Sequence, residues 1–242
     1  MELVTLTAIS LNSSQPRERL KATFSEIRHF NTLPAEVQAA IMTVAVPRHF
    51  DMGQVIYLEG EPAEFVYILE RGWVKATRIT REGREQGLLF LRPVDIFGDI
   101  AVFAETTYPG TTTALESVDV WVIPSPMILE LAKRYPDLAL AIIRKLSERV
   151  LHYINLVEDL SLRSVEARLV YTLLRNAELC HGQLVVPRRE WTTFDEMAVR
   201  LGTVRDVLSR ALKALEVEGY IRVEKHAIVL LDPKSLAELT DR

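Results

Sequence analysis

Short apolar runs separated by turn residues fill the chain between about residues 48 and 123. The runs are rich in β-branched and aromatic residues, which favour strands: VIYL (55–58), FVYILE (65–70), WVKATRIT (73–80), GLLFL (87–91) and VDVWVI (118–123). Glycines punctuate these runs where tight turns are needed: Gly53, Gly60, Gly72, Gly83 and Gly98. The pattern predicts a barrel or rolled sheet, preceded by a helix near 34–44 and followed by one near 126–134.

Beyond Pro136 the apolar residues recur at alternating steps of three and four. The residues in this series are Ile143, Leu146, Val150, Tyr153, Val157 and Leu160. Such a series forms the seam of a two-stranded coiled coil. We therefore expect a helix over about 137–160 that joins two copies of the chain into a homodimer. Packing of this helix on the strand-rich segment of its own chain is the alternative.

The last third of the chain predicts three helices and several short strands. After a break at Ser161, apolar residues at helical spacing continue to Leu174, and QLVVP (183–187) then reads as a strand. Residues 192–216 form two short amphipathic helices hinged at Gly202, and YIRV (220–223) and AIVLL (227–231) follow as a hairpin. A helix pair followed by a hairpin predicts a winged helix-turn-helix.

The second helix of this pair separates apolar from polar residues. At about 100° per residue, six apolar residues fall within an arc of roughly 140°: Val204, Val207, Leu208, Ala211, Leu212 and Leu215. The opposite arc carries Arg205, Asp206, Ser209, Arg210 and Lys213. The first helix starts with a capping box, Thr193 and Glu196. This pattern fits a helix in a DNA groove and equally an ordinary surface helix pair, so the neighbouring segments must decide.

Composition and charge narrow the classes of protein. The chain has 242 residues, of which 48% are hydrophobic and 26% charged, so two cores are expected. No apolar stretch approaches the length of a membrane span and no secretory signal is visible, so we expect a cytoplasmic protein without membrane contact. The net charge is −4, and residues 160–242 carry 13 Lys and Arg against 12 Asp and Glu. DNA binding would therefore rely on the local placement of cations.

The order of elements resembles the CRP/FNR family of bacterial transcription regulators over about residues 24–242. Five segments carry the resemblance: GQVIYLEGEP (53–62), ILERGWVKATR (68–78), GREQGLLFL (83–91), DIFGDIAVF (95–103) and GTVRDVLSRALKALEVEGYI (202–221). The resemblance implies an α+β fold with an N-terminal β-roll like the cyclic-nucleotide-binding jelly roll. We accordingly divide the chain into an N-terminal extension (1–23), a sensor domain (24–135), a dimerisation helix (136–161) and a winged helix-turn-helix domain (162–242).

The resemblance also implies roles for the polar arc of the second helix. Arg205, Asp206 and Arg210 stand where the family places its base-reading Arg, Glu and Arg, and Ser209 occupies a further base-reading position. Arginine can bond bidentately to guanine, and a carboxylate can accept from cytosine N4. Lys213 and Thr193 suit phosphate contacts that set the register.

Two departures from the family put the operator sequence in doubt. Asp206 is shorter than the usual glutamate, and Val204 replaces the Ser or Thr that precedes the recognition arginine.

The sensor domain departs from cyclic-nucleotide-binding relatives. Gly98-Asp99 keeps a form of their Gly-Glu pair, but TTYPGTTT (106–113) lacks the arginine that holds the phosphate, and Tyr153-Ile154 replaces the adenine-reading pair. A buried phosphodiester would lack a counter-charge, so we do not expect cyclic AMP as the effector. An unidentified small ligand or no ligand remains. Polar residues that could border a ligand are Asp99, Thr106, Thr111, Thr112 and Tyr153.

Cysteine and histidine content limits the cofactors. The single cysteine, Cys180, excludes disulfides within the chain and a cysteine-ligated iron-sulfur or zinc cluster. Haem would need an axial ligand such as His49 or His152, but the five histidines are scattered, and no His-x-His pair marks a metal enzyme. We therefore expect no cofactor.

The expected partners are double-stranded DNA, a second copy of the chain and RNA polymerase. The loop around 181–189 lies where relatives contact the polymerase, which favours activation over repression. Two other classes of function are possible. The first is a regulatory cyclic-nucleotide-binding module of a larger assembly, which would not explain the helices and strands predicted over 163–231. The second is an enzyme, which would need a nucleophile elbow, a phosphate-binding glycine loop or an HExxH motif, and none of these occurs in the sequence.

Overall fold

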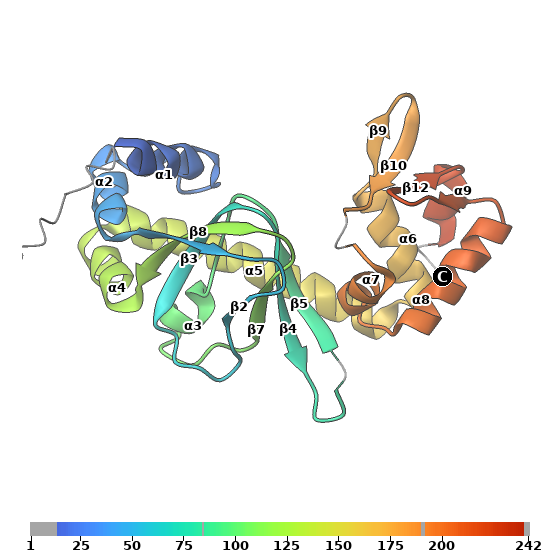
Figure 1. Cartoon of the computed structure of the whole chain (residues 1–242), viewed down its shortest axis with the longest axis horizontal. Helices are drawn as coiled ribbons and strands as arrows, with labels where there is room; N and C mark the ends of the chain where they lie inside the picture. The colour runs from blue at the N-terminus through green and yellow to red at the C-terminus, as the bar shows by residue number, and fades with distance from the viewer. Residues whose placement is uncertain (1–13, 84, 190–191, 240–242) are drawn as a thin grey trace, which may run out of the picture.

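The molecule consists of a larger β-rich lobe and a smaller helical lobe connected by one long helix, α5 (Pro136–Leu162) (Figure 1). This computed structural model describes residues 14–83, 85–189 and 192–239. The two lobes correspond to the expected sensor and winged helix-turn-helix domains.

The larger lobe is a β-roll of two four-stranded sheets, in the orders β1-β8-β3-β6 and β2-β7-β4-β5. Its strands are β1 (Val46–Phe50), β2 (Val55–Tyr57), β3 (Phe65–Arg71), β4 (Val74–Ile79), β5 (Glu85–Leu91), β6 (Asp95–Phe97), β7 (Thr111–Ala114) and β8 (Val118–Pro124). All five apolar runs form strands, and the predicted β-roll is confirmed. The runs gave no signal for β1, which is largely exposed, for β7, which is mostly threonine, or for the short β6.

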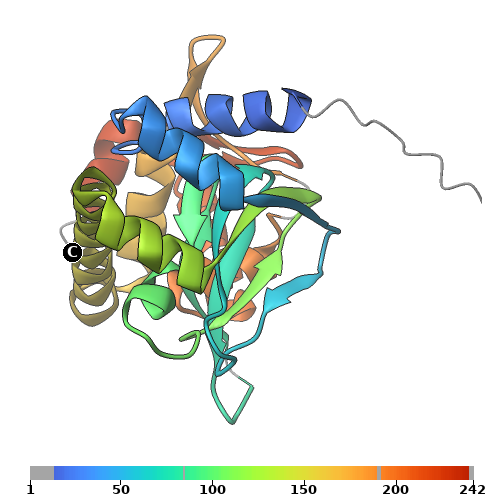
Figure 2. The ribbon, with the colours of Figure 1, turned by 90° about the vertical axis from the view of Figure 1, so that its left-hand side faces the viewer.

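Helices cover one face of the β-roll: α1 (Ser14–Glu26), α2 (Ala35–Val44) and α4 (Ser125–Arg134) gather at the end of the molecule farthest from the smaller lobe (Figure 2). A fourth, short helix, α3 (Asp99–Phe103), follows β6. Leu20 and Phe24 of α1 are fully buried in the same core as Ile68 and Ile123 of the sheet. The expected boundary between residues 23 and 24 is therefore wrong at this point, because α1 crosses it and packs as part of the sensor core.

The long helix α5 is slightly longer than predicted and passes through the expected break at Ser161. The next helix, α6 (Val165–Arg175), starts instead at Ser164, whose side chain accepts a hydrogen bond from the backbone N–H of Ala167 at 3.1 Å. Near its N-terminal end α5 buries Leu138 and Ile142 against the β-roll of its own chain. Large apolar side chains on another face stay exposed: Leu140, Ile143, Val150, Leu151, Ile154 and Val157.

The described part of the smaller lobe packs four helices on a four-stranded sheet in the order β11-β12-β10-β9. Besides α6, its elements are β9 (Glu178–Cys180), β10 (Gln183–Pro187), α7 (Phe194–Leu201), α8 (Arg205–Val217), β11 (Ile221–Val223), β12 (Ala227–Leu230) and α9 (Pro233–Glu238). Leu169, Leu208 and Ile228 form the centre of its core, each fully buried. The predicted helix pair and the following hairpin are confirmed.

Candidate nucleic-acid interface

The helix pair α7–α8 is shaped by the residues at its ends. Thr193 caps α7, because its hydroxyl accepts a hydrogen bond from the backbone N–H of Glu196 at 3.2 Å. Gly202 ends α7 in the left-handed conformation, with φ 64° and ψ 42°, which a residue with a Cβ adopts only at a cost. The chain can therefore turn sharply into α8, whose residues Leu208 and Leu212 are buried on the lobe.

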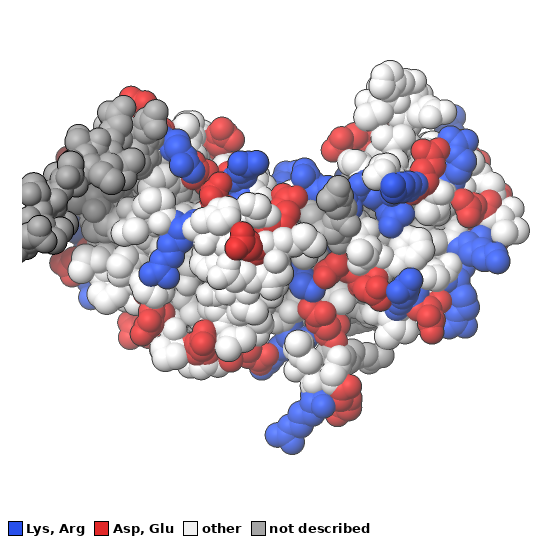
Figure 3. Space-filling model, in the orientation of Figure 1, with Lys and Arg blue, Asp and Glu red and all other residues white. Residues whose placement is uncertain are grey.

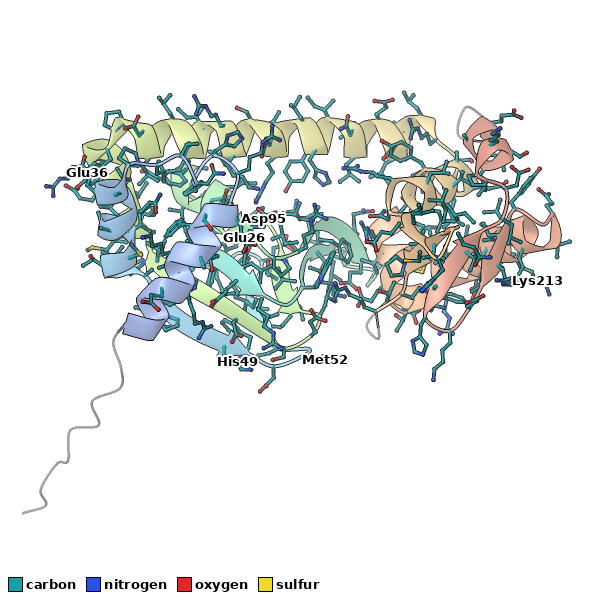
Figure 4. All side chains as sticks on the ribbon, turned by 90° about the horizontal axis from the view of Figure 1, so that it is seen from above. Glu26, Glu36, His49, Met52, Asp95 and Lys213 are labelled. Atoms are coloured by element: carbon teal, nitrogen blue, oxygen red, sulfur yellow. The ribbon has the colours of Figure 1, made fainter. Side chains whose placement is uncertain are left out.

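The polar arc of α8 faces solvent. Arg205, Asp206, Arg210 and Lys213 are exposed and Ser209 is half-buried. Lys213 lies at the end of the molecule away from the β-roll (Figure 4). Basic and acidic side chains are mixed over this end (Figure 3), in keeping with the nearly neutral charge of the domain.

The two arginines make only weak contacts within the chain. The Nη1 of Arg205 lies 3.2 Å from a carboxylate oxygen of Asp195, and the Nε of Arg210 donates to the backbone carbonyl of Asp206 at 3.3 Å. The Arg205–Asp195 pair is about 60% exposed on both sides, and exposed ion pairs contribute little. Both guanidinium groups can therefore turn toward another acceptor at small cost.

The expected reciprocal half of the capping box is used elsewhere. The carboxylate of Glu196 contacts the Nζ of Lys75 on β4 at 2.7 Å, and Lys75 also lies 3.1 Å from Glu85. Burial lowers the pKa of Lys75, but the two carboxylates outweigh it and hold this pKa above its ordinary value. A charged, half-buried group thus connects the first helix of the pair to the β-roll.

Two glycines mark how closely the lobes approach each other. A Cβ on Gly87 of β5 would lie 3.0 Å from the backbone oxygen of Val199 on α7. A Cβ on Gly202 would lie 2.7 Å from the side chain of Leu160 and 2.9 Å from that of Gln86. The helix-turn-helix is therefore seated directly on β5 and the end of α5.

The sensor lobe encloses a cavity of about 40 Å³ between β5, α3 and α5. Of the polar residues proposed to border a ligand, Asp99 and Tyr153 line this cavity, whereas Thr106, Thr111 and Thr112 do not. Thr106 is exposed, Thr111 accepts a hydrogen bond from the backbone N–H of Glu59, and Thr112 is buried in β7. In the sequence these three threonines lie close to Tyr108 and Gly110, which line the cavity, but they do not line it themselves.

Aromatic side chains occupy most of this region. The rings of Tyr57 and Tyr108 stack with centroids 3.7 Å apart, and those of Tyr67 and Phe97 stack at 4.9 Å. Burial raises the pKa of all three tyrosine hydroxyls, which are neutral throughout the physiological range. Sequence reasoning missed these residues, although the tyrosines at 57 and 67 lie within predicted strands.

A buried ion pair closes the cavity on the side of α5. Arg149 lies 3.0 Å from Asp99 and donates to the backbone carbonyl of Ile96 at 2.6 Å. Only 6% of the Arg149 side chain and 4% of the Asp99 side chain are exposed. Burial raises the pKa of Asp99, and Arg149 opposes this shift. Sequence reasoning missed this role of Arg149, because its partner is 50 residues away.

The histidines considered for haem have other surroundings. His49 on β1 bonds Asp119 through Nδ1 at 2.8 Å, and His152 lies on α5 in the cleft between the lobes. Within the described part of the chain, no group of three or more His, Cys, Asp or Glu residues could hold a metal ion. No described helix is long and apolar enough to cross a membrane.

Comparison with known proteins adds family information to this geometry. Residues 47–135 match the family model of the cyclic nucleotide-binding domain, and residues 167–239 match that of the Crp-like helix-turn-helix domain. The CRP-like cAMP-activated global transcriptional regulator of Mycobacterium tuberculosis is 27% identical over 82% of this chain and 90% of its own length. The global nitrogen regulator of Synechococcus elongatus is 28% identical, over 78% of this chain and 87% of its own.

Solved structures share the fold. The c-di-GMP responsive global regulator CLP of Xanthomonas campestris superposes with a TM-score of 0.72 at 21% identity, over 82% of this chain and all of that chain. A CRP/FNR-family regulator of Thermus thermophilus reaches 0.61 at 28% identity, over 81% and 99% of the two chains.

A β-roll followed by a long helix and a helix-turn-helix defines the class of two-domain bacterial transcription regulators. The chain belongs to the CRP/FNR family of this class, as its two domain matches and its relatives show.

Proposed function

We propose that this protein is a cytoplasmic, homodimeric activator of transcription that reads a palindromic operator with α8. The observation that carries the proposal is the exposed polar arc of α8 on a fully packed helix-turn-helix. Arg205, Asp206, Ser209 and Arg210 would contact bases, and Lys213 and Thr193 would contact phosphates. A twofold axis would present two such helices about one helical turn apart, roughly 34 Å.

The exposed apolar side chains of α5 support the dimer. Ile143, Val150, Ile154 and Val157 are each more than half exposed in the single chain. Apolar residues at this helical spacing are stabilised when a second copy of the helix covers them. Leu146 and Tyr153, which the sequence placed in the interface, are partly buried in their own chain. We therefore place the centre of the interface on the neighbouring face of α5, which carries Ile154.

The sensor cavity supports an effector other than cyclic AMP, or none. Its volume of about 40 Å³ is far below the 300–1,000 Å³ of typical small-molecule sites. The buried cation next to it, Arg149, is already paired with Asp99. A phosphodiester would therefore have to displace stacked tyrosines and compete with a carboxylate.

Activation is proposed from the β9–β10 hairpin. The hairpin stands out from the smaller lobe (Figure 1), and its turn residues, His181 and Gly182, are exposed. Such a projection is free to contact RNA polymerase bound beside the operator.

The proposal is tested by selecting bound sequences from a pool of random duplexes with the purified, ligand-free protein. We expect enrichment of a palindromic motif. Enrichment only after addition of a cell extract would show that an effector is needed, and enrichment of a motif without twofold symmetry would contradict the dimeric reading. A matched selection with Arg205→Ala, which leaves the lobe core intact, should lose the motif.

A further inference from the structure

A cleft lies beside α5 where the β-roll and the smaller lobe meet. Its main hollow has a volume of about 480 Å³, within the range of small-molecule sites. An adjoining hollow of about 360 Å³ shares several of its walls, among them Phe90, Arg92, Asn176 and Arg200. In Figure 4, α5 runs along one side of the molecule past both the β-roll and the smaller lobe, and all three supply walls of the cleft.

Arg92, Arg175 and Arg200 are among the arginines that line this cleft. Among the described residues, no ion pair involves Arg92, Arg175 or Arg200. Arg200 is stacked over the ring of Phe90 at 5.6 Å, which supplies contact area without neutralising the charge. The cleft therefore carries an excess of positive charge.

The carboxylates of the main hollow cannot neutralise these arginines, because each already has a cation. Asp95 pairs with Lys145 at 2.6 Å, Glu148 with Arg28 at 3.3 Å, and Asp159 with Arg163 at 3.1 Å. In the adjoining hollow Glu196 pairs with Lys75, and Glu178 is exposed at its rim.

The effects of these charges on their neighbours agree with the geometry. Burial and then Arg175 lower the pKa of Arg200. Burial lowers the pKa of His152, and Arg175, Arg149 and Arg200 lower it further. The arginines therefore act together on one region of the cleft.

The walls of the cleft also offer planar and polar groups. Trp73, Phe90 and Tyr171 line it, each with a guanidinium of the chain over its ring. Nucleobases stack on such aromatic rings and on guanidinium planes. The amide of Asn176 donates to the backbone carbonyl of Thr172 at 2.7 Å, which leaves its oxygen available as an acceptor. Guanidinium groups bind phosphates bidentately.

We propose that this cleft binds a nucleoside diphosphate or triphosphate, with the phosphates on Arg92, Arg175 and Arg200 and the base against the aromatic walls. The site adjoins the sensor cavity, with which it shares the wall residues Leu88, Leu89 and Arg149, and it does not depend on the operator proposed above. Its walls come from β5, α5, α6 and α7, so a bound nucleotide contacts both lobes. Binding consequently favours the orientation of the helix-turn-helix seen here over other orientations.

Isothermal titration calorimetry of the full-length protein with ADP tests the proposal, with inorganic pyrophosphate and adenosine as comparison ligands. We expect ADP to bind more tightly than either comparison ligand. Arg175→Gln and Arg200→Gln should each weaken ADP binding tenfold or more, with circular dichroism spectra unchanged. The matched control is Arg81→Gln, which removes an exposed guanidinium from the turn between β4 and β5 and should leave the affinity unchanged.

Three outcomes would overturn the proposal. Absence of ADP binding would exclude a nucleotide in the cleft. Equal affinity for pyrophosphate and ADP would exclude a contribution of the base. An equal loss of ADP affinity in Arg81→Gln would show that ADP binding depends on the overall charge of the protein and not on this site. Operator binding, measured separately by the sequence selection, can succeed or fail in each case.

Discussion

In the sensor lobe, the buried guanidinium of Arg149 is paired with groups of its own chain. The segment 106–113 contains no arginine, yet the structure supplies a buried guanidinium from α5, held by Asp99 and a backbone carbonyl. The buried guanidinium of this lobe is therefore neutralised inside the chain by a carboxylate.

We expect Arg149→Met to destabilise the protein by about 3–5 kcal/mol near pH 8, because it leaves Asp99 buried without its partner. Loss of Arg149 raises the pKa of Asp99 further above its unfolded value. The native variant then binds a proton that the unfolded chain has released, so its stability increases as the pH falls from 8 to 5. Urea unfolding at both pH values and fixed protein concentration measures the difference.

The control for this experiment is the double variant with Asp99→Asn and Arg149→Met. Without the carboxylate, the loss of stability should be smaller than in Arg149→Met and should not depend on pH. A loss of equal size at pH 5 and pH 8 in the single variant would show that packing, and not the charge of Asp99, dominates.

The arginine and lysine of α8 should be separable by their effects on DNA. We expect Arg210→Ala to weaken operator binding by about 1–3 kcal/mol and to relax specificity, because a base contact is lost. Lys213→Ala should weaken operator and random duplex alike and reduce the salt slope by about one. Fluorescence anisotropy with both duplexes at several salt concentrations measures this, and equal losses for Arg210→Ala on both duplexes would contradict its assignment.

At the scale of the element, the sequence predicted most helices and strands that carry a strong apolar period. The helix at 137–160 and the strand at 183–187 were recovered within two residues or less. Elements without such a period were missed. α1 is strongly polar, and only its contacts in the folded chain reveal that Leu20 and Phe24 belong to the sensor core.

The candidate sites were predicted unevenly for the same reason. The polar arc of α8 depends on helical spacing alone and lies on one exposed face, as expected. The sensor cavity and the cleft depend on residues that are distant in the sequence. Asp99 pairs with Arg149, and Glu196 pairs with Lys75 instead of completing the capping box at the start of α7. No local pattern in one sequence specifies such pairs.

The start of α8 offers a stabilising change. Val204 is its N-cap residue, with extended backbone and no side-chain cap, and it is 47% exposed. We expect Val204→Ser to stabilise the smaller lobe by about 1 kcal/mol, because a serine hydroxyl can accept a hydrogen bond from an unpaired backbone N–H of the first turn. Thermal unfolding measures the change.

A matched variant at the other end of the helix tests the cause. Val217 is the last residue of α8 and is 78% exposed. Val217→Ser makes the same substitution where no N-terminal N–H can be capped, so the unfolding temperature should not rise. A similar increase in both variants would point to an effect of side-chain polarity.

At the scale of the whole molecule, the exposed apolar face of α5 predicts the oligomeric state. We expect Ile154→Glu to convert the dimer to a monomer, because two buried carboxylates would face each other across the interface. The mass from light scattering should halve, and affinity for a palindromic duplex should fall at least tenfold. Asn155→Glu, an equally charged change at the adjacent exposed position, is the control and should remain dimeric. A dimeric Ile154→Glu would place the interface elsewhere.

The close approach of the two lobes has a consequence for how such proteins can be recombined. Gly87 leaves room for the backbone of α7, and Gly202 leaves room for Leu160 and Gln86 of the other lobe. Lys75 likewise depends on Glu196 for its charge balance. In a chimera that joins this sensor lobe to the helix-turn-helix of a relative, the contact surfaces of the two lobes would therefore not match. Both sides of the contact would have to be transferred together. The two domains have separate cores, but their contacting surfaces have to be exchanged together.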